Sequence, residues 1–468
     1  MRPAPQKVTV REHAWLCTES VAATLDCAQV SESAFDYLCR LSERFSRGGA
    51  RLLQVEGRQR LKLDNFVGVI QTPCGTVLEI VPKHHAEGGS LAEARALLRK
   101  LLLALLDLPT RDVGVASLQL FDAPLSEWVM GRFLRELDTL VSRGLRFEYQ
   151  RVDEELPFLR GQLNLNQQLR QPPGRGHRFH VRHEVYLPDR PENRLLKLAL
   201  DRVRQSTHDA NHWRLAQELS FRLAEIPSSR QVEADLRSWG QDRLLAHYCP
   251  IKPWCELILN QHMPLAVAGD YQGISLLFPM EKLFERFVAR WLRTSLAPSL
   301  EIRTPARSKS LCEHQQKPIF RLEPDIYISD GTLCWILDTK WKLLDASRRV
   351  DKYGLSQTDF YQLFAYGQKY LGGVGRMALI YPRTEAFYNP LDAFKFDERL
   401  HLEVLPFDLD QERLLGVERL GFAPRSMRLA AKPVADRGQR ARSSLPSPLP
   451  SPRRGHINQM MRGFPHPL

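Results

Sequence analysis

Two carboxylates and a lysine are spaced along residues 319–342 in a pattern suited to holding a metal ion. Asp325 ends one apolar, β-prone run, and Asp338 and Lys340 lie two residues apart in the next such run. Side chains at positions i and i+2 of a strand share a face, so Asp338 and Lys340 are expected to point the same way. Hard divalent cations prefer carboxylate oxygens, and a neighbouring lysine can orient water or offset developing negative charge.

A tight turn is predicted between the two runs. Asp330-Gly331 supplies the positive φ that a hairpin turn needs, and pairing of the two runs would bring the far end of the second strand back near Asp325. A salt bridge between Asp338 and Lys340 is the structural alternative to a metal site. That alternative requires two charges inside an apolar strand, where burying unpaired charge costs several kcal/mol.

Two amphipathic helices are predicted on either side of these strands. The upstream helix at 279–292 carries Glu285, with Glu281 one turn before it. The downstream helix carries Gln362 and Tyr366, which lie four residues apart and therefore share one face. An ordinary helix with a polar stripe would show the same pattern, so this spacing alone leaves both interpretations open.

The order of these features resembles that of a known class of nucleases. The Asp325, Asp338 and Lys340 spacing is similar to the PD-(D/E)xK motif of restriction-endonuclease-like enzymes, and the flanking Glu285 helix and Gln-x-x-x-Tyr helix resemble the RecB-like branch. More widely, the chain resembles the McrC family over about residues 60–410. The segments that carry this resemblance are LLFPMEKLFERFVARWL, EPDIYI, ILDTKWKLL and TDFYQLFAYGQKY, with looser agreement in GVIQTPCGTVLEIVPKH, RGQL and PENRLLKLAL.

The resemblance implies a metal-dependent endonuclease that cleaves phosphodiester bonds of DNA. Mg²⁺ would be held by Asp325, Asp338 and the main-chain carbonyl of Thr339, with Glu285 as a further ligand or as a partner of a metal-bound water. Lys340 would position the attacking water or neutralise the phosphate. Gln362 would form a hydrogen bond near the scissile phosphate or with a metal-bound water, and Tyr366, one turn further along the same helix face, completes the expected catalytic set.

A partner is also implied by the resemblance. McrC subunits join a hexameric AAA+ GTPase, McrB, in a modification-dependent (5-methylcytosine-type) restriction system that acts on double-stranded DNA, and they stimulate GTP hydrolysis. The chain contains no GxxxxGK[ST] phosphate loop, so it is not itself a P-loop nucleotide hydrolase. Two alternatives remain open at this point: a non-catalytic adaptor of an AAA+ motor, and a stand-alone RecB-like repair nuclease.

The fold class predicted from the alternation of elements is α/β (α+β overall). Residues 1–250 are expected to form a mixed α+β adaptor region that docks the AAA+ partner. Residues 251–420 are expected to form a restriction-endonuclease-like domain with a mixed sheet flanked by helices, and residues 421–468 a disordered, basic, Pro/Ser-rich tail. In the 251–420 segment, helices are predicted near 252–263, 279–296 and 357–371, and strands near 300–304, 319–328, 332–341, 376–382 and 401–409.

Bulk properties narrow the class of protein. The chain has 468 residues and a net charge of +12, but the nine Lys and Arg residues of 425–468 account for most of that charge. The rest of the chain is therefore only mildly basic, and its charge gives weak support for DNA binding.

No apolar run reaches the roughly 18 residues of a membrane span and no signal peptide begins the chain, so a cytoplasmic protein is expected. The eight cysteines form no CxxC pair, which argues against a zinc ribbon.

Overall fold

The fold is described from a computed structural model. The structure describes residues 6–47, 51–57, 59–83, 90–108, 124–172, 174–240, 243–259 and 275–421. Apart from Gly421, the predicted tail at 421–468 lies outside the described residues. No helix in this described part of the chain is long and apolar enough to cross a membrane.

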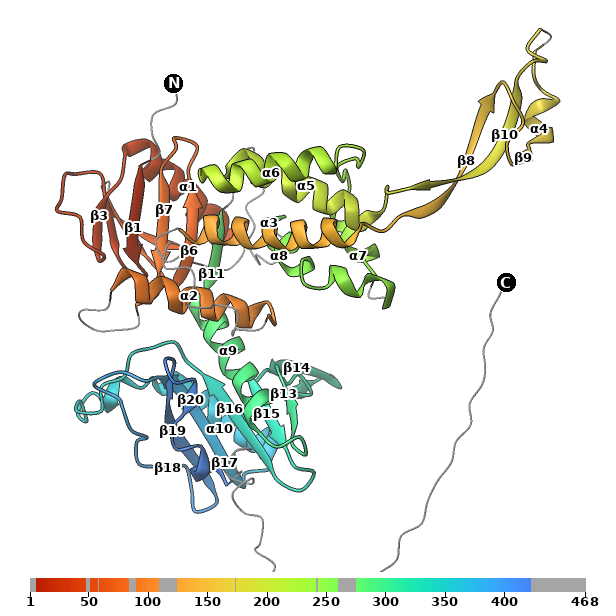
Figure 1. The fold of residues 1–468 in the computed structure, drawn as a ribbon. Helices are drawn as coiled ribbons and strands as arrows, with labels where there is room; N and C mark the ends of the chain where they lie inside the picture. Colours follow the sequence, from red (N-terminus) through yellow and green to blue (C-terminus); the bar gives the residue numbers. More distant parts are fainter. Residues whose placement is uncertain are drawn as a thin grey trace, which may run out of the picture. The chain divides into compact units, whose positions relative to one another are not determined.

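Two four-stranded sheets form the first part of the chain (Figure 1). One has the order β1-β7-β6-β11, and the other has the order β3-β2-β5-β4. Gly75 lies in the turn between β6 and β7 with φ +91°, a conformation that glycine adopts without strain. The strands of the two sheets are β1 (Lys7–Arg11), β2 (Trp15–Cys17), β3 (Cys27–Gln29), β4 (Leu53–Glu56), β5 (Arg60–Leu63), β6 (Phe66–Gln71), β7 (Val77–Val81) and β11 (Leu276–Pro279).

Helices pack around these sheets through leucine-rich faces. A capping box begins α2, because the Ser90 side chain accepts from the Glu93 amide and the Glu93 side chain accepts from the Ser90 amide. The helices are α1 (Glu32–Arg47), α2 (Leu91–Leu105), α3 (Leu125–Arg143), α5 (Pro191–Ser206), α6 (Ala210–Arg222), α7 (Val232–Ser238), the 3₁₀ helix η3 (Arg243–Tyr248) and α8 (Lys252–Ile258). Their buried side chains belong to a core shared with the sheets.

A long antiparallel arm interrupts the helices. It consists of β8 (Glu148–Leu156) paired with β10 (Phe179–Leu187), to which the short β9 (Gln162–Leu163) and α4 (Leu165–Gln168) are attached. Figure 1 shows the arm extending away from the helices that flank it in the sequence. Most of its side chains are at least partly exposed, so the arm is held together mainly by its main-chain ladder.

The last described part of the chain contains a mixed sheet with the order β12-β15-β16-β17-β19-β18, and β20 pairs with β19. β15 and β16 are antiparallel, whereas β16, β17 and β19 run parallel. This mixed sheet between helices confirms the predicted α/β fold class. Its elements are α9 (Met280–Ser295), β12 (Glu301–Arg303), β15 (Ile326–Ser329), β16 (Cys334–Thr339), the 3₁₀ helix η4 (Lys352–Gly354), α10 (Gln357–Leu371), β17 (Gly375–Pro382), β18 (Phe394–Lys395), β19 (Leu400–Asp408), β20 (Arg413–Leu414) and the 3₁₀ helix η5 (Val417–Leu420).

Alternate residues of β16 contribute to two different cores. Leu337 belongs to the core that contains α9, whereas Ile336 belongs to a second core with Leu363 and Tyr366 of α10. The two helices therefore cover opposite faces of the sheet. Because side chains alternate along a strand, Asp338 lies on the same face as Ile336, which is the face that α10 covers.

The strand predicted at 319–328 is not continuous. Residues Lys317–Leu322 form β14, which pairs with β13 (Lys309–His314) in a separate two-stranded sheet, and β15 begins only at Ile326. The break falls at Pro324, which has no amide to donate to a ladder. The second predicted strand, 332–341, is also shorter, because β16 ends at Thr339.

The predicted hairpin turn between β15 and β16 is confirmed. Gly331 has φ +94°, and the Asp330 carboxylate accepts hydrogen bonds from the amides of Thr332 and Leu333 at 2.8 and 2.7 Å. The side chain of Asp330 thus closes the turn while glycine takes the left-handed conformation. The pairing brings Ile326 opposite Leu337, so Asp325 lies beside the end of β16.

The strand β11 lies after the predicted boundary at residues 250 and 251 but belongs to a sheet formed mainly by residues before it. It lies in the segment assigned to the nuclease-like domain, yet it pairs with β6 of the first sheet and leads directly into α9. The Met280 amide donates to the carbonyl of Asn65 and continues this attachment. The three-part division of the chain stays a prediction.

Candidate active site

The centre of the candidate site is an ion pair between Asp338 and Lys340. The ammonium of Lys340 donates to Oδ2 of Asp338, whose side chain is buried at the end of β16 with only 1% of its surface exposed. Burial, followed by repulsion from the Asp325 carboxylate, raises the pKa of Asp338 to about 7. Burial alone would lower the pKa of Lys340, but the Asp338 carboxylate outweighs it and raises that pKa. The salt bridge weighed as an alternative is therefore present.

Asp325 is fixed by the residue that precedes Lys340. The amide and the hydroxyl of Thr339 both donate to Oδ2 of Asp325, each at 2.8 Å. These bonds hold one oxygen of the Asp325 carboxylate, and no described residue forms a hydrogen bond with the other oxygen. The sequence predicted a ligand role for the Thr339 carbonyl and did not predict that its amide and hydroxyl orient Asp325.

Glu285 is the acidic residue of α9 that faces this cluster. It is buried, with 7% exposure, whereas Glu281 is exposed on the solvent side of the same helix. Burial and the Asp325 carboxylate raise the pKa of Glu285 above its usual value, so the two carboxylates lie near each other. Lys282 donates to Glu285 at 2.5 Å. Sequence reasoning missed Lys282, although its position three residues before Glu285 on the same helix face could have indicated this contact.

The two polar residues predicted on α10 join the same network. The ammonium of Lys340 lies 3.5 Å from Oε1 of Gln362, and Nε2 of Gln362 donates to the Tyr366 hydroxyl at 2.9 Å. Tyr366 is buried, and burial followed by the Asp338 charge raises its pKa. The structure therefore brings all six predicted catalytic residues together, from α9, from the β15–β16 hairpin and from α10.

A fourth carboxylate near the cluster was missed by sequence reasoning. Asp359 lies in the first turn of α10, and its charge raises the pKa values of both Asp338 and Lys340. The hydroxyl of Tyr381 on β17 donates to Asp359 at 3.4 Å. Asp359 lies three residues before Gln362 on the same helix face, and this spacing in the sequence could have indicated that it lies near the site.

The chemistry of this set of donors suits a hard divalent cation. The Asp325 carboxylate is close enough to Glu285 and to Asp338 to raise the pKa of each of them, which is the repulsion that a bound cation relieves. In the described part of the chain, no three His, Cys, Asp or Glu side chains already converge as metal ligands.

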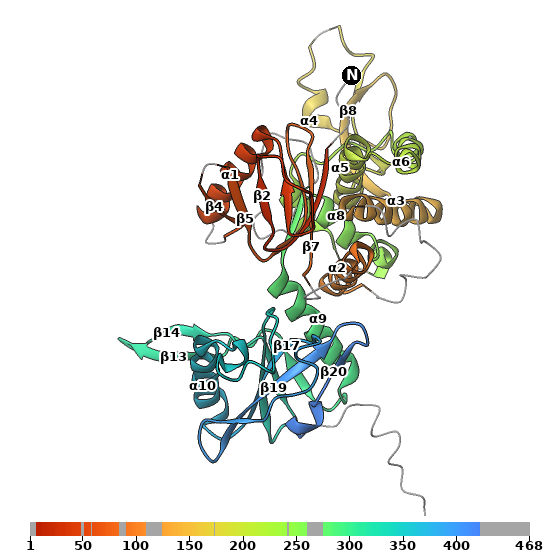
Figure 2. The same ribbon diagram turned by 90° about the vertical axis from the view of Figure 1, so that its left-hand side faces the viewer.

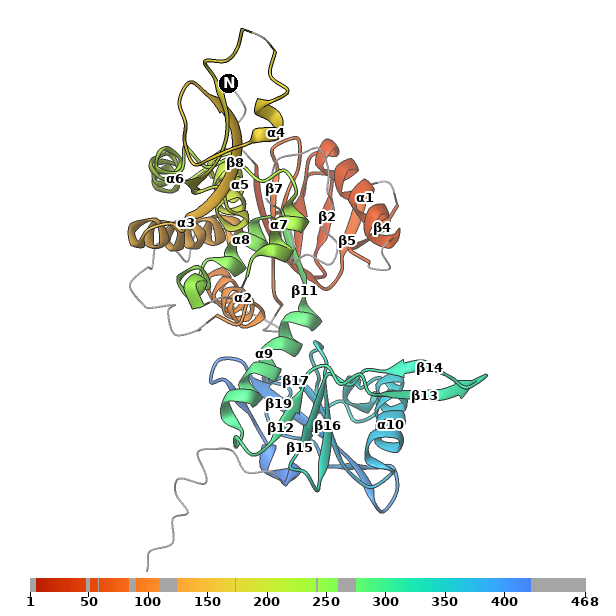
Figure 3. The same ribbon diagram turned by 90° about the vertical axis from the view of Figure 1, so that its right-hand side faces the viewer.

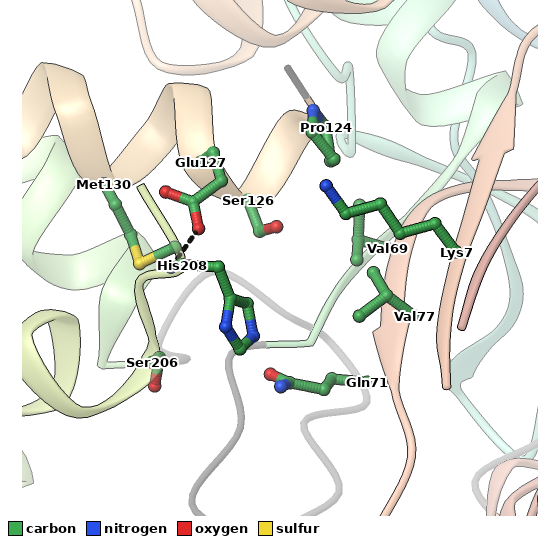
Figure 4. Close-up of a pocket in the computed structure, with 10 residues that line it drawn as sticks. All are labelled: Lys7, Val69, Gln71, Val77, Pro124, Ser126, Glu127, Met130, Ser206 and His208. Carbon is green, nitrogen blue, oxygen red and sulfur yellow. Dashed lines mark hydrogen bonds between the residues drawn. The ribbon is translucent and has the colours of Figure 1, made fainter. Parts of the chain in front are cut away.

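A separate pocket lies in the first part of the chain and contains none of the six residues. Figure 4 shows Glu127 of α3 facing into it beside His208. The Glu127 carboxylate already accepts from the Thr207 hydroxyl at 2.9 Å, the His208 amide at 2.7 Å and the His212 ring at 3.2 Å. These interactions account for the buried charge structurally, so we place the candidate site at the β15–β16 hairpin.

Comparisons with known proteins agree with this architecture. Residues 61–382 match the family described as McrBC 5-methylcytosine restriction system component. None of the curated proteins matches the sequence. One similar solved structure is a chain of the refined half-complex from the tetradecameric assembly of Thermococcus gammatolerans McrB AAA+ hexamers with bound McrC. It has a TM-score of 0.64 and 20% identity, over 86% of this chain and 95% of that chain.

A chain of the cryo-EM structure of the Thermococcus gammatolerans McrBC complex is also similar, with a TM-score of 0.49 and 21% identity, over 62% of this chain and 87% of that chain. At 20% identity the first of these likenesses shows a shared fold. The family match spans more than half of the sequence and confirms the resemblance that the sequence motifs indicated. The chain therefore belongs to the McrBC 5-methylcytosine restriction system component family.

Proposed function

We propose that this chain is the Mg²⁺-dependent endodeoxyribonuclease subunit of a modification-dependent restriction system. The observation that carries the proposal is that the Lys340 ammonium pairs with Asp338 while the Asp325 carboxylate lies near both Asp338 and Glu285, on the hairpin that follows the PD-(D/E)xK pattern. Asp325 raises the pKa of both Glu285 and Asp338, which are buried, and perturbed carboxylates gathered in this way are typical of functional sites. The family to which the chain belongs favours double-stranded DNA with modified cytosine as the substrate.

In the proposed mechanism, Asp325, Asp338 and the Thr339 carbonyl would hold Mg²⁺, and Glu285 would support it directly or through water. When bound, the cation lowers the pKa of a coordinated water and stabilises the charge that develops on the phosphate. The Thr339 amide and hydroxyl keep Asp325 in place. Lys340 releases Asp338 and turns its ammonium toward the attacking water or a phosphate oxygen, where Gln362 supports it.

Plasmid cleavage by Asp338→Ala and Lys340→Ala proteins, with the partner present, tests this function. Both substitutions are expected to reduce the cleavage rate by at least about 100-fold, the range found for groups that act on protons or charge in the transition state. The wild-type protein should lose activity on addition of a chelator. Undiminished cleavage by both variants would show that this cluster is not the site of hydrolysis.

We further propose that residues 1–250 dock a hexameric AAA+ GTPase similar to McrB and stimulate its GTP hydrolysis. Two observations support this: the shared fold with a chain from an assembly in which McrC is bound to McrB AAA+ hexamers, and the exposed apolar side chains of the β8–β10 arm. Large exposed apolar groups on a rigid element are typical of protein-binding surfaces. The arm residues concerned are Tyr149, Phe158, Leu159, Leu165, Leu169 and Tyr186.

Nucleotide turnover by the partner, measured with and without the purified chain, tests the docking proposal. Addition of the chain is expected to raise the GTP hydrolysis rate, and substitution of Leu165 and Leu169 by Ser should weaken the effect. If the rate of GTP hydrolysis by the partner does not change at saturating concentrations of the chain, the adaptor role is excluded.

A second candidate function, a non-catalytic adaptor, is favoured by one specific observation. Lys340 neutralises Asp338 in the described structure, as it would in an inactive nuclease fold. Metal-dependent nicking of DNA by the complex discriminates between the two functions, because an adaptor alone produces none.

A further inference from the structure

Most side chains of the two-stranded ribbon of β13 and β14 are exposed. Its strands pair from Lys309 opposite Leu322 to His314 opposite Lys317, and no third strand from the described part of the chain joins them. Figures 2 and 3 both show the ribbon projecting beside α10. An isolated two-stranded hairpin is only marginally stable in water, so a ribbon exposed on both faces is expected to have an external binding role.

The base of the ribbon is tied to the candidate active site. The Tyr370 hydroxyl of α10 donates to the carbonyls of Ala306 and Leu322 at 3.2 and 3.0 Å, one on each side of the ribbon. The Ala306 amide donates to the Pro324 carbonyl at 3.1 Å, immediately before Asp325. Six residues of strand span about 20 Å, so the ribbon extends that far from a base fixed beside the carboxylates.

Positive charge dominates the two strands. Lys309, Lys317 and Arg321 have no ion-pair partner among the residues that the structure describes, and Glu313 is the single acidic residue of the two strands. Two of these cations lie on β14, namely Lys317, which is opposite His314, and Arg321, which is opposite Ser310. Their Cα atoms are about 13 Å apart along the strand, which lets each cation reach a different phosphate of a nucleic-acid backbone.

Two apolar side chains stand opposite each other in the middle of the ribbon. Phe320 is 69% exposed and Leu311 is 42% exposed, and they lie between the pairs Ser310–Arg321 and Cys312–Ile319. Phe320 has φ +54°, a left-handed conformation that a bulky residue rarely adopts and that costs on the order of 1–3 kcal/mol. Strain of this kind at an exposed aromatic residue is typical of a functional surface.

We propose that the β13–β14 ribbon is a DNA-binding arm that enters a groove of the duplex and holds the phosphodiester chain against the candidate active site. The inference rests on the proposed nuclease function and names the element that grips its substrate. The major groove of B-DNA, roughly 12 Å wide, admits a two-stranded β-ribbon. Lys317 and Arg321 contact phosphates, and the exposed Phe320 and Leu311 contact the groove floor.

The exposed thiol of Cys312 on the ribbon provides a direct test of the proposal. The full chain is mixed with a fluorescent duplex in chelator and low salt, so that binding is measured without cleavage. Thiol alkylation is then followed by mass spectrometry. The duplex is expected to slow alkylation of Cys312 several-fold, while Cys74 and Cys249, which are also exposed, react at unchanged rates. Equal alkylation of Cys312 at saturating duplex, or no duplex binding at all, overturns the proposal.

The salt dependence of binding provides the second test. Lys317→Ala/Arg321→Ala is expected to reduce the slope of log affinity against log salt by about 2, since each phosphate contact contributes about 0.9. The matched control Lys395→Ala/Arg399→Ala removes two exposed cations of the same domain and should leave the slope unchanged. An unaltered slope in the ribbon variant overturns the proposal and indicates that an acidic protein surface is the occupant.

The two proposals can fail separately. If the duplex does not slow the alkylation of Cys312 but Asp338→Ala abolishes cleavage, the DNA-binding arm is excluded and the nuclease proposal stands. If the duplex slows the alkylation of Cys312 but the Asp338→Ala protein cleaves normally, the hydrolytic site is excluded and the DNA-binding arm stands.

Discussion

At the scale of single residues, Lys340 has two functions that compete. Its ammonium neutralises the buried Asp338 in the described structure, yet the proposed mechanism needs that carboxylate for a cation. A buried carboxylate that loses its partner is strongly destabilising, by about 3–5 kcal/mol, unless another cation replaces it. The Lys340 ammonium therefore supplies to Asp338 the positive charge that Mg²⁺ would supply in the proposed mechanism.

This exchange predicts a metal-dependent rescue of stability. Lys340→Met should lower the melting temperature in chelator, because it leaves the Asp338 charge buried and unpaired. Addition of Mg²⁺ should then raise the melting temperature of the variant by more than that of the wild type. The double variant Asp338→Asn/Lys340→Met, which lacks the charge, should not respond in this way. Equal Mg²⁺ shifts in all three proteins would contradict a cation site at Asp338.

The two acidic residues of α9 offer a matched pair of variants. Glu285→Gln is expected to lower the cleavage rate by about 10–100-fold, the usual effect of losing a group that supports a metal-bound water. Glu281→Gln, one turn away and exposed, should leave the rate unchanged. Cleavage assays over a range of Mg²⁺ concentrations separate the effects, because a metal-supporting role predicts partial recovery at high Mg²⁺. Equal rates for both variants would remove Glu285 from the site.

At the scale of elements, α10 joins the site to the ribbon. One face carries Asp359, Gln362 and Tyr366 toward the carboxylates, and Tyr370 one turn further on holds the base of the β13–β14 ribbon. A movement of this helix would therefore displace the lysine network and the ribbon together. The packing of Leu363 and Tyr366 against β16 and β17 fixes the helix in this position.

The attachment of β11 to β6 predicts a severe effect of one substitution. Gly68 has φ +133°, and a Cβ atom there would lie 1.8 Å from the carbonyl oxygen of Leu276 in β11. Gly68→Ala should therefore reduce the free energy of unfolding by on the order of 3 kcal/mol or more, as measured by chemical denaturation. The control is Gly57→Ala, because Gly57 also has positive φ but no atom within 4 Å of such a Cβ. Similar losses in both variants would show that backbone strain alone, and not contact with β11, decides the effect.

At the scale of the whole described molecule, Glu12 connects the first sheet to the candidate site. The Trp341 indole and the Lys83 amide both donate to Oε1 of Glu12 at 2.8 Å, and Trp341 directly follows Lys340. The other oxygen of Glu12 has no hydrogen-bond partner among the described residues. Complete burial raises the pKa of Glu12 to about 7, with the hydrogen bonds and the Lys83 charge lowering it and Asp64 raising it.

This raised pKa predicts a pH dependence of stability. Because the folded state binds the proton more tightly than the unfolded state, whose pKa is near 4.5, stability falls as pH rises from about 4.5 to about 7. Glu12→Gln cannot titrate, so relative to the wild type it should gain stability between pH 5 and pH 8, by on the order of 3 kcal/mol. Urea denaturation at the two pH values measures this gain. A constant difference between the proteins at both pH values would contradict a neutral, buried Glu12.

The sequence alone determined the features that depend on neighbouring residues. The α9 and α10 helices follow from their periodicity, and the turn at Asp330-Gly331 follows from its chemistry. The i, i+2 spacing of Asp338 and Lys340 likewise predicted their common face, and the ion pair agrees with it. Local steric and hydrogen-bonding preferences suffice for each of these, so no distant part of the chain had to be known.

Only the tertiary structure decided which of these residues meet. Burial against the sheet selects Glu285 over Glu281, and pairing with β13 separates β14 from β15 at Pro324. The bond between Glu12 and Trp341 joins residues that are 329 positions apart. Such contacts are set by how distant elements pack and by the need to satisfy buried polar groups, and a single sequence does not encode these in any local pattern.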